Sequence, residues 1–130
     1  MTEANKRVLI VEDEEDILTA WRAALESKGY EVETANSAER ALELIREKDI
    51  HLVLTDIVMP GFDGLRLTSA IKEEAPSVKI LAVSGGGKLG SPEELLDRAI
   101  DLGADHVLCK PIRLADLLGA VHRVLVIDGM

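Results

Sequence analysis

Residues 8–13, VLIVED, join a run of four apolar residues to two adjacent acids, and this arrangement sets the pattern for the chain. Apolar runs at 52–54, 80–83 and 107–109 are likewise followed by a reactive side chain. Each run has the length of a short strand and is apolar throughout, as is typical of parallel strands covered on both faces. The carboxyl ends of parallel strands lie along one edge of an open α/β sheet. We therefore expect a single site at that edge, built from Glu12, Asp13, Asp56, Ser84 and Lys110.

The segments between the runs show helical periodicity, so that strand and helix alternate five times over residues 1–130. The run at 31–35 differs, because Glu31 and Glu33 alternate with less polar residues, which predicts a half-exposed strand at the edge of the sheet. An edge position for the second strand fits a flavodoxin-like, doubly wound α/β fold. The sequence thus predicts one (βα)5 domain with a five-stranded parallel sheet in the order 2-1-3-4-5.

The expected helices carry apolar stripes that should face the core. Trp21 lies on such a stripe of the first helix, which favours a core position over a cofactor site. The fourth helix has the clearest boundaries, with Ser91 as its N-cap and Gly103 at its end. The fifth is expected at about 114–126 with Leu114 among its inward-facing residues. Because the chain ends soon afterwards, we expect no effector domain.

Composition excludes several classes of function. Against 24 Asp and Glu there are 15 Lys and Arg, and the formal net charge of -9 disfavours binding to nucleic acid or to an anionic membrane surface. No apolar stretch approaches the ~20 residues of a membrane span, and the first seven residues are not a signal-type segment. We therefore expect a cytoplasmic protein. The single cysteine, Cys109, excludes a disulfide framework and is expected to be a small core residue.

The expected site combines carboxylates with a hydroxyl and an ammonium group. Glu12 and Asp13, close to Asp56 in the folded sheet, would concentrate negative charge that needs a cation. Mg²⁺ suits such a pocket, because it prefers carboxylate and carbonyl oxygens and leaves coordination positions for a phosphoryl group. A carboxylate can also attack phosphorus to form an aspartyl phosphate. Lys110 and Ser84 would then bind the phosphoryl oxygens.

Taken singly, these residues have simpler explanations. Asp13 could be a helix N-cap and Lys110 a solvated strand end, and for either residue alone the simpler explanation is favoured. Four strand ends of this kind in one chain reverse that judgement, because chance rarely places reactive residues at all of them.

Four stretches resemble the receiver domain of response regulators: VEDEED at 11–16, LTDIVMPGFDG at 54–64, AVSGGG at 82–87 and GADHVLCKP at 103–111. The resemblance covers essentially the whole chain. It implies that Asp56 accepts a phosphoryl group from a histidine kinase or phosphotransfer protein, and that an altered surface then binds a downstream protein. It also implies that Glu12, Asp13, Asp56 and the backbone carbonyl of Val58 bind Mg²⁺, while Ser84 and Lys110 hold the phosphoryl group. Such a domain is a phosphoacceptor, not a conventional enzyme.

Two features depart from the family pattern. Val107 stands where the family often has an aromatic residue whose rotation reports phosphorylation, and Ile112 stands where phenylalanine often follows the Lys-Pro pair. Phosphorylation chemistry is unaffected, but output through aromatic repacking is in doubt. The segment from Ser84 to Lys110 is also a few residues longer than is common, with the excess at 85–90, and we expect this loop to take over the switching role.

Three alternatives are weaker. Gly85, Gly87 and Gly90 spell a dinucleotide-binding G-x-G-x-x-G, but the next helix begins after the third glycine instead of containing it. A flavodoxin-type electron carrier fits the fold, yet the chain has only one Phe, one Tyr and one Trp to stack on a flavin. A binding module whose acids do not take up phosphate is not distinguished by the sequence.

Overall fold

A computed structural model describes residues 6–59, 62–84 and 92–127. Its main sheet has five parallel strands in the order β2-β1-β3-β6-β7. The strands are β1 (Arg7–Val11), β2 (Glu31–Ala35), β3 (Leu52–Asp56), β6 (Lys79–Ser84) and β7 (His106–Cys109). A short antiparallel pair, β4 (Val58–Met59) and β5 (Phe62–Asp63), follows β3 and was not expected. Counted along the main sheet alone, the order is the predicted 2-1-3-4-5.

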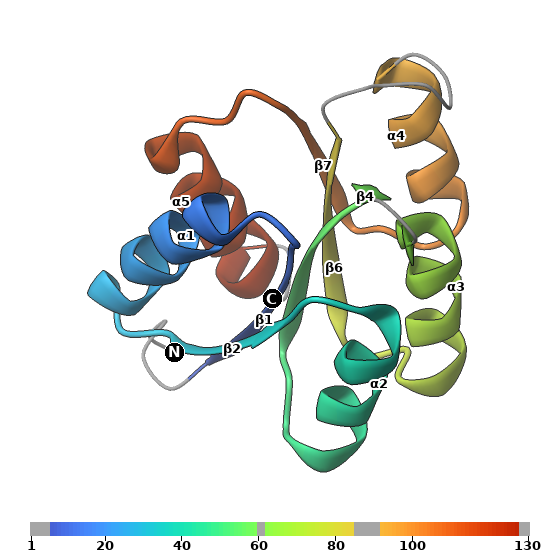
Figure 1. Cartoon of the computed structure of the whole chain (residues 1–130), viewed down its shortest axis with the longest axis horizontal. Coiled ribbons are helices and arrows are strands. Elements are labelled where there is room, and N and C mark those ends of the chain that lie inside the picture. The colour runs from blue at the N-terminus through green and yellow to red at the C-terminus, as the bar shows by residue number, and fades with distance from the viewer. Residues whose placement is uncertain (1–5, 60–61, 85–91, 128–130) are drawn as a thin grey trace.

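The helices cover both faces of the sheet. They are α1 (Glu15–Ser27), α2 (Ala38–Glu47), α3 (Gly64–Glu74), α4 (Pro92–Asp101) and α5 (Leu114–His122), the last continued by a π-helical turn at Arg123–Ile127. Figure 1 shows α1 and α5 on one face and α2, α3 and α4 on the other. Among the described residues, no helix combines the length and apolar character that a membrane crossing requires.

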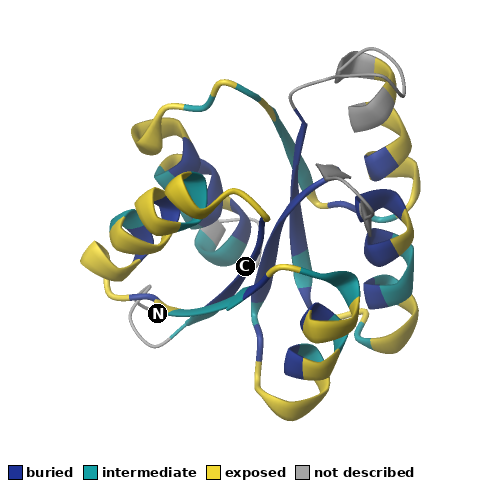
Figure 2. Cartoon of the chain, in the orientation of Figure 1, coloured by how far each residue is buried: buried dark blue, intermediate teal, exposed yellow. Residues whose placement is uncertain are grey.

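Two apolar clusters, one on each face, explain why the inner strands are apolar throughout. Alternate residues of β1 point to opposite faces, so Leu9 packs in the cluster beneath α2 and α3, and Ile10 in the cluster beneath α1 and α5. Neither residue has any exposed surface. In Figure 2 the inner strands β1, β3 and β6 are buried over most of their length, and most exposed residues lie on the outer faces of the helices and in connecting segments. β2 has an exposed or half-buried residue at every position but its last, as predicted for an edge strand.

The end of α4 depends on Gly103. This residue has φ of +117°, a left-handed conformation that favours glycine, and its amide N–H donates to the Ile100 carbonyl. The helix stop predicted at Gly103 is therefore confirmed. The predicted N-cap, Ser91, lies outside the described residues.

Two burial predictions were wrong. Cys109 is exposed, because it is the last residue of β7, which lies at the edge of the sheet that the described residues form. Leu114 is 44% exposed, since it is the first residue of α5 and lies beyond the part of that helix that packs on the sheet. Apolar periodicity identifies the face of an element but not where the neighbouring elements end.

Candidate functional site

Two of the expected carboxylates leave the sheet side by side. Val11 pairs with Thr55 in the register of β1 and β3, so the next residues along these strands, Glu12 and Asp56, are neighbours. Both are buried, with 2% and 4% of their surfaces exposed. The amide N–H of Glu12 also donates to the carbonyl of Ala35 at 3.2 Å, which fixes the end of β1 on its other side. The fold thus holds two acids together in the centre of the carboxyl edge.

Lys110 reaches the same point from the edge strand. Ser84 pairs with Cys109 at the ends of β6 and β7, and the amide N–H of Lys110 extends this pairing by donating to the Ser84 carbonyl at 2.8 Å. The Nζ of Lys110 donates to Asp56 Oδ2 at 2.7 Å and to Glu12 Oε1 at 3.3 Å. The three side chains therefore form one charged cluster, although Lys110 follows Asp56 by 54 positions.

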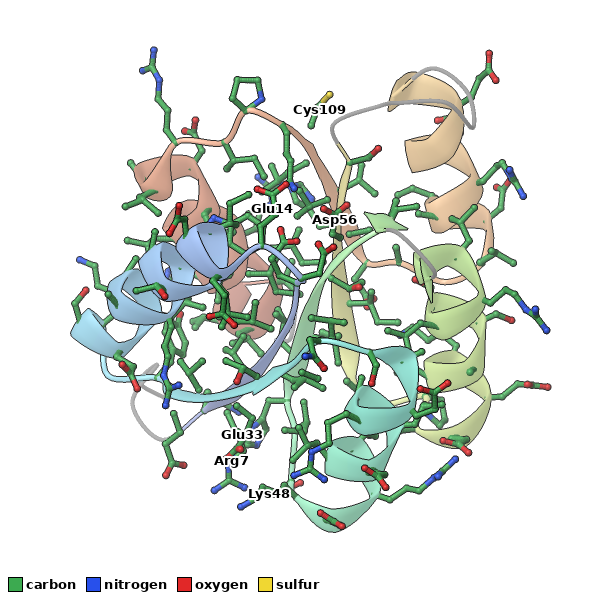
Figure 3. The ribbon with its side chains drawn as sticks, in the orientation of Figure 1. Arg7, Glu14, Glu33, Lys48, Asp56 and Cys109 are labelled. Atoms are coloured by element: carbon green, nitrogen blue, oxygen red, sulfur yellow. The ribbon has the colours of Figure 1, made fainter. Side chains whose placement is uncertain are left out.

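Glu12 also shapes the turn that leads into α1. Its Oε2 accepts hydrogen bonds from the amide N–H groups of Asp13 at 3.0 Å and Glu14 at 3.4 Å. The cap position of α1 is Glu14, and no side chain caps it, so the simpler explanation of Asp13 as the N-cap is wrong. Asp13 is exposed beside the buried cluster. Figure 3 shows Glu14 and Asp56 at the same end of the sheet.

The charges in the cluster perturb one another. Burial raises the pKa of Glu12 above its ordinary value of 4.5, and the negative charge of Asp56 adds to this effect while Lys110 opposes it. Burial lowers the pKa of Lys110, but the hydrogen bond and charge of Asp56, with those of Glu12, outweigh burial and leave it above 10.5. Lys110 lies closer to Asp56 than to Glu12, and burial outweighs its effect on the pKa of Glu12. The cluster carries more negative than positive charge.

The remaining predicted residues lie on the same edge. Ser84 ends β6 and is fully buried. Val58 begins β4 two residues after Asp56, where its backbone pairs with that of Asp63. Within the described part of the chain, the structure therefore brings Glu12, Asp56 and Lys110 into direct contact, and sets Ser84 and Val58 at the ends of the neighbouring segments.

Sequence reasoning placed Gly64 and Trp21 on their helices but did not predict their contacts at the cluster. Gly64 begins α3 against the backbone that follows β3, and a Cβ added to it would lie 2.6 Å from both the Asp56 carbonyl oxygen and the Ile57 Cα. Trp21 places its ring centroid 5.9 Å from Lys110 Nζ. Gly64 stands inside the stretch 54–64 that matched the family, which was a usable signal. For Trp21 the apolar stripe indicated only a core position.

Comparison with known proteins decides the family. The model described as "Response regulator receiver domain" matches residues 8–122. The chain belongs to the response regulator receiver domain family. It is 34% identical over 122 residues to the response regulator receiver protein CpdR of Brucella abortus, covering 93% of this chain and 98% of the relative. It is also 34% identical over 120 residues to the chemotaxis protein CheY of Halobacterium salinarum, and this match covers 92% of this chain and 97% of the relative.

Solved structures agree with this assignment. A CheY-like receiver domain protein from Methanospirillum hungatei superposes with a TM-score of 0.87 at 32% identity, covering 97% of this chain and 98% of that one. Receiver domains are phosphoacceptor signalling domains of two-component systems, and they interact with histidine kinases and downstream targets. The family match decides against the electron-carrier hypothesis.

Receiver domains generally bind Mg²⁺ at the phosphorylation site, and the residues present here fit that ion. The cluster and the adjacent Asp13 offer three carboxylates against the one ammonium group of Lys110. Burial is the main cause of the raised pKa of Glu12, and the negative charge of Asp56 adds to it. Oxygen donors suit Mg²⁺, which usually keeps several waters. Across residues 6–59, 62–84 and 92–127, no three His, Cys, Asp or Glu side chains already converge as a metal site. Backbone oxygen and water would therefore complete the coordination.

Val107 lies at the margin of the core. It pairs with Ala82 of β6 and packs, partly buried, against the cluster beneath α2, α3 and α4. Valine has no aromatic ring, so this position cannot report phosphorylation by rotation of a ring between an exposed and a buried state. The segment 85–90, expected to take over the switching role, lies outside the described residues, so that expectation stays a prediction.

Proposed function

We propose that residues 1–130 form a response regulator receiver domain in which Asp56 accepts a phosphoryl group from a histidine kinase or a histidine phosphotransfer protein. The reaction depends on Mg²⁺, takes place in the cytoplasm and switches a surface that binds a downstream protein. The observation that carries the proposal is the partly buried contact between Lys110 Nζ and Asp56 Oδ2 at 2.7 Å. This contact supports the proposal because it gives Asp56, the one buried aspartate among the described residues, a neighbouring positive charge.

The transfer is a displacement at phosphorus. A carboxylate oxygen of Asp56 attacks the phosphorus of phosphohistidine, an O–P bond forms, and the P–N bond breaks with its electron pair going to the imidazole nitrogen, which then binds a proton. Lys110 supplies a positive charge for a phosphoryl oxygen, and the Ser84 hydroxyl donates a hydrogen bond to another. The same groups support slow hydrolysis of the acyl phosphate afterwards.

Charge balance explains the need for a divalent ion. A phosphoryl group adds roughly two negative charges to a cluster that already has an excess of them. Glu12, Asp13, Asp56 and the Val58 carbonyl would hold Mg²⁺, and the ion would supply charge neutralisation for the phosphoryl oxygens. Lys110 alone would have to divide one charge among two carboxylates and the incoming group.

The test is intact-mass measurement after incubation with Mg²⁺ and acetyl phosphate. We expect one phosphoryl group on the wild type and on Asp49→Asn, a control at an exposed position away from the carboxyl edge, and none on Asp56→Asn. Chelation of Mg²⁺ should abolish uptake. A wild type without added mass would instead favour the module whose acids do not take up phosphate, and uptake by Asp56→Asn would move the acceptor elsewhere.

A further inference from the structure

Lys110 has an aromatic neighbour as well as its two carboxylates. Its Nζ lies 5.9 Å from the centroid of the Trp21 ring, within the ~6 Å range of cation–π attraction. The carboxylates come from the sheet, whereas the ring comes from α1. The proposed phosphoryl chemistry uses both carboxylates and assigns nothing to the ring.

The ring is the fixed partner in this contact. Trp21 is 5% exposed and packs in the cluster beneath α1 and α5, on the same stripe as Leu25 one turn further along the helix. A large ring in a close-packed core has little room to move. The Lys110 side chain is 22% exposed and ends on a flexible stem. The contact therefore restricts the lysine more than it restricts the tryptophan.

Lys110 would have an alternative position if the ring were absent. A pocket of about 520 Å³ is lined by Glu14, Ile17, Trp21, Lys110, Pro111 and Ile112. Glu14 is exposed and is the one acid in the lining of this pocket, so it offers the ammonium group a partner other than Glu12 and Asp56. Truncation of the indole would enlarge the pocket and let the ammonium group turn from Asp56 toward Glu14 and solvent.

We propose that Trp21 is a positioning residue, which holds the Lys110 ammonium group against Asp56 and reports its position through fluorescence. The inference rests on the proposed function and deepens it. When Asp56 carries a phosphoryl group, the ammonium group must follow the new oxygens, and its distance from the ring changes. The chain contains one Trp, so its emission comes from this ring alone.

Three variants test the proposal. Trp21→Leu removes the aromatic ring, and Trp21→Phe replaces the indole with a smaller aromatic ring. Leu25→Ala removes buried volume from the same stripe of α1, one turn away from the contact between Trp21 and Lys110. From the strength of a partly exposed cation–π contact, Trp21→Leu should take up phosphate from acetyl phosphate about two- to fivefold more slowly than wild type. Trp21→Phe should recover most of that rate. Leu25→Ala should lower stability but leave the uptake rate of the folded protein unchanged.

Two spectroscopic readouts separate positioning from a purely structural role. Wild-type emission should change on phosphorylation. The Hε protons of Lys110 should show an upfield ring-current shift by NMR in wild type and in Trp21→Phe, and that shift should disappear in Trp21→Leu. This second measurement needs no phosphorylation.

Equal rates of phosphate uptake for wild type and Trp21→Leu would overturn the positioning role. The same conclusion would follow if the chemical shift of the Lys110 Hε protons were the same in both proteins. A wild type that takes up no phosphate overturns the proposed function instead, and the Lys110 resonance then decides the positioning role by itself.

Discussion

Replacement of Gly64 by alanine should damage the acceptor end of β3 through a backbone clash. The new Cβ would lie 2.6 Å from the Asp56 carbonyl oxygen, 2.6 Å from the Ile57 Cα and 2.9 Å from the Ile57 carbonyl oxygen. Ordinary contact begins at 3.4 Å, so the segments must separate by about 0.8 Å. All three atoms belong to backbone and cannot rotate away. Separation would also stretch the hydrogen bond from the Gly64 N–H to the Ile57 carbonyl, now 3.1 Å.

Overpacking of this kind costs about 1–3 kcal/mol of unfolding free energy. Because the shift falls on Asp56, it should also pull the carboxylate away from Lys110. Misplacement of a reacting group by ~1 Å can slow a reaction by about 100-fold. We therefore expect Gly64→Ala to slow phosphoryl uptake by roughly one to two orders of magnitude.

The matched control is Gly119→Ala, a glycine-to-alanine change inside α5 where an added Cβ meets no atom within 4 Å. It should raise stability by about 0.5–1 kcal/mol, because alanine loses less conformational entropy in a helix. Urea denaturation of both variants measures the stabilities, and intact mass against time measures the uptake. A Gly64→Ala protein that is as stable and as reactive as wild type would refute the close approach of α3 to the acceptor segment.

Three further outcomes follow from the same contacts. Burial raises the pKa of Glu12, so this group contributes stability that is fully present below pH 4.5 and is lost as the pH rises through its folded-state pKa. Glu12→Gln should therefore flatten that part of the plot of unfolding free energy, measured in urea, against pH. An unchanged slope would count against burial of Glu12 in the cluster. Mg²⁺ affinity, measured by calorimetric titration, should fall as the pH drops through the same pKa, because protonated Glu12 is a poor ligand; a pH-independent affinity would argue against Glu12 as a ligand. Lys72→Met should lower the unfolding free energy by about 1 kcal/mol, because Lys72 Nζ donates hydrogen bonds to the Val78 carbonyl at 3.1 Å and to Asp105 Oδ2 at 3.2 Å. Urea denaturation measures the change. An unchanged unfolding free energy would mean that hydrogen bonds to water replace both of these bonds in the variant.

The inner strands and the acid-lysine cluster could be predicted because their signals are local and strong. β1 is buried on both faces, which requires an unbroken apolar run, and topology then forces the residue after each run to the same edge. Glu12, Asp56 and Lys110 follow from that rule without any measurement of distance. Because these charges are largely buried, solvent screens the interaction between them less than it would at the surface.

The features that escaped prediction depend on distances between elements. The exposure of Cys109 depends on its place at the end of β7, the edge strand of the described sheet, and the exposure of Leu114 on the extent of packing along α5. The approach of Gly64 to Ile57 and of Trp21 to Lys110 depends on where two helices lie relative to the ends of strands. Periodicity assigns such residues to a face, but it carries no information on what meets them there.

Transfer from a phosphohistidine to Asp56 is the central claim, and one measurement tests it directly. A histidine kinase or phosphotransfer protein carrying labelled phosphate on histidine is mixed with the wild-type chain and Mg²⁺, and the acyl phosphate is reduced with borohydride and located by peptide mass spectrometry. We predict transfer of the label and reduction at position 56 alone. Label that stays on the donor, or reduction at another carboxylate such as Glu12 or Asp13, would contradict the assignment of Asp56 as the phosphoacceptor.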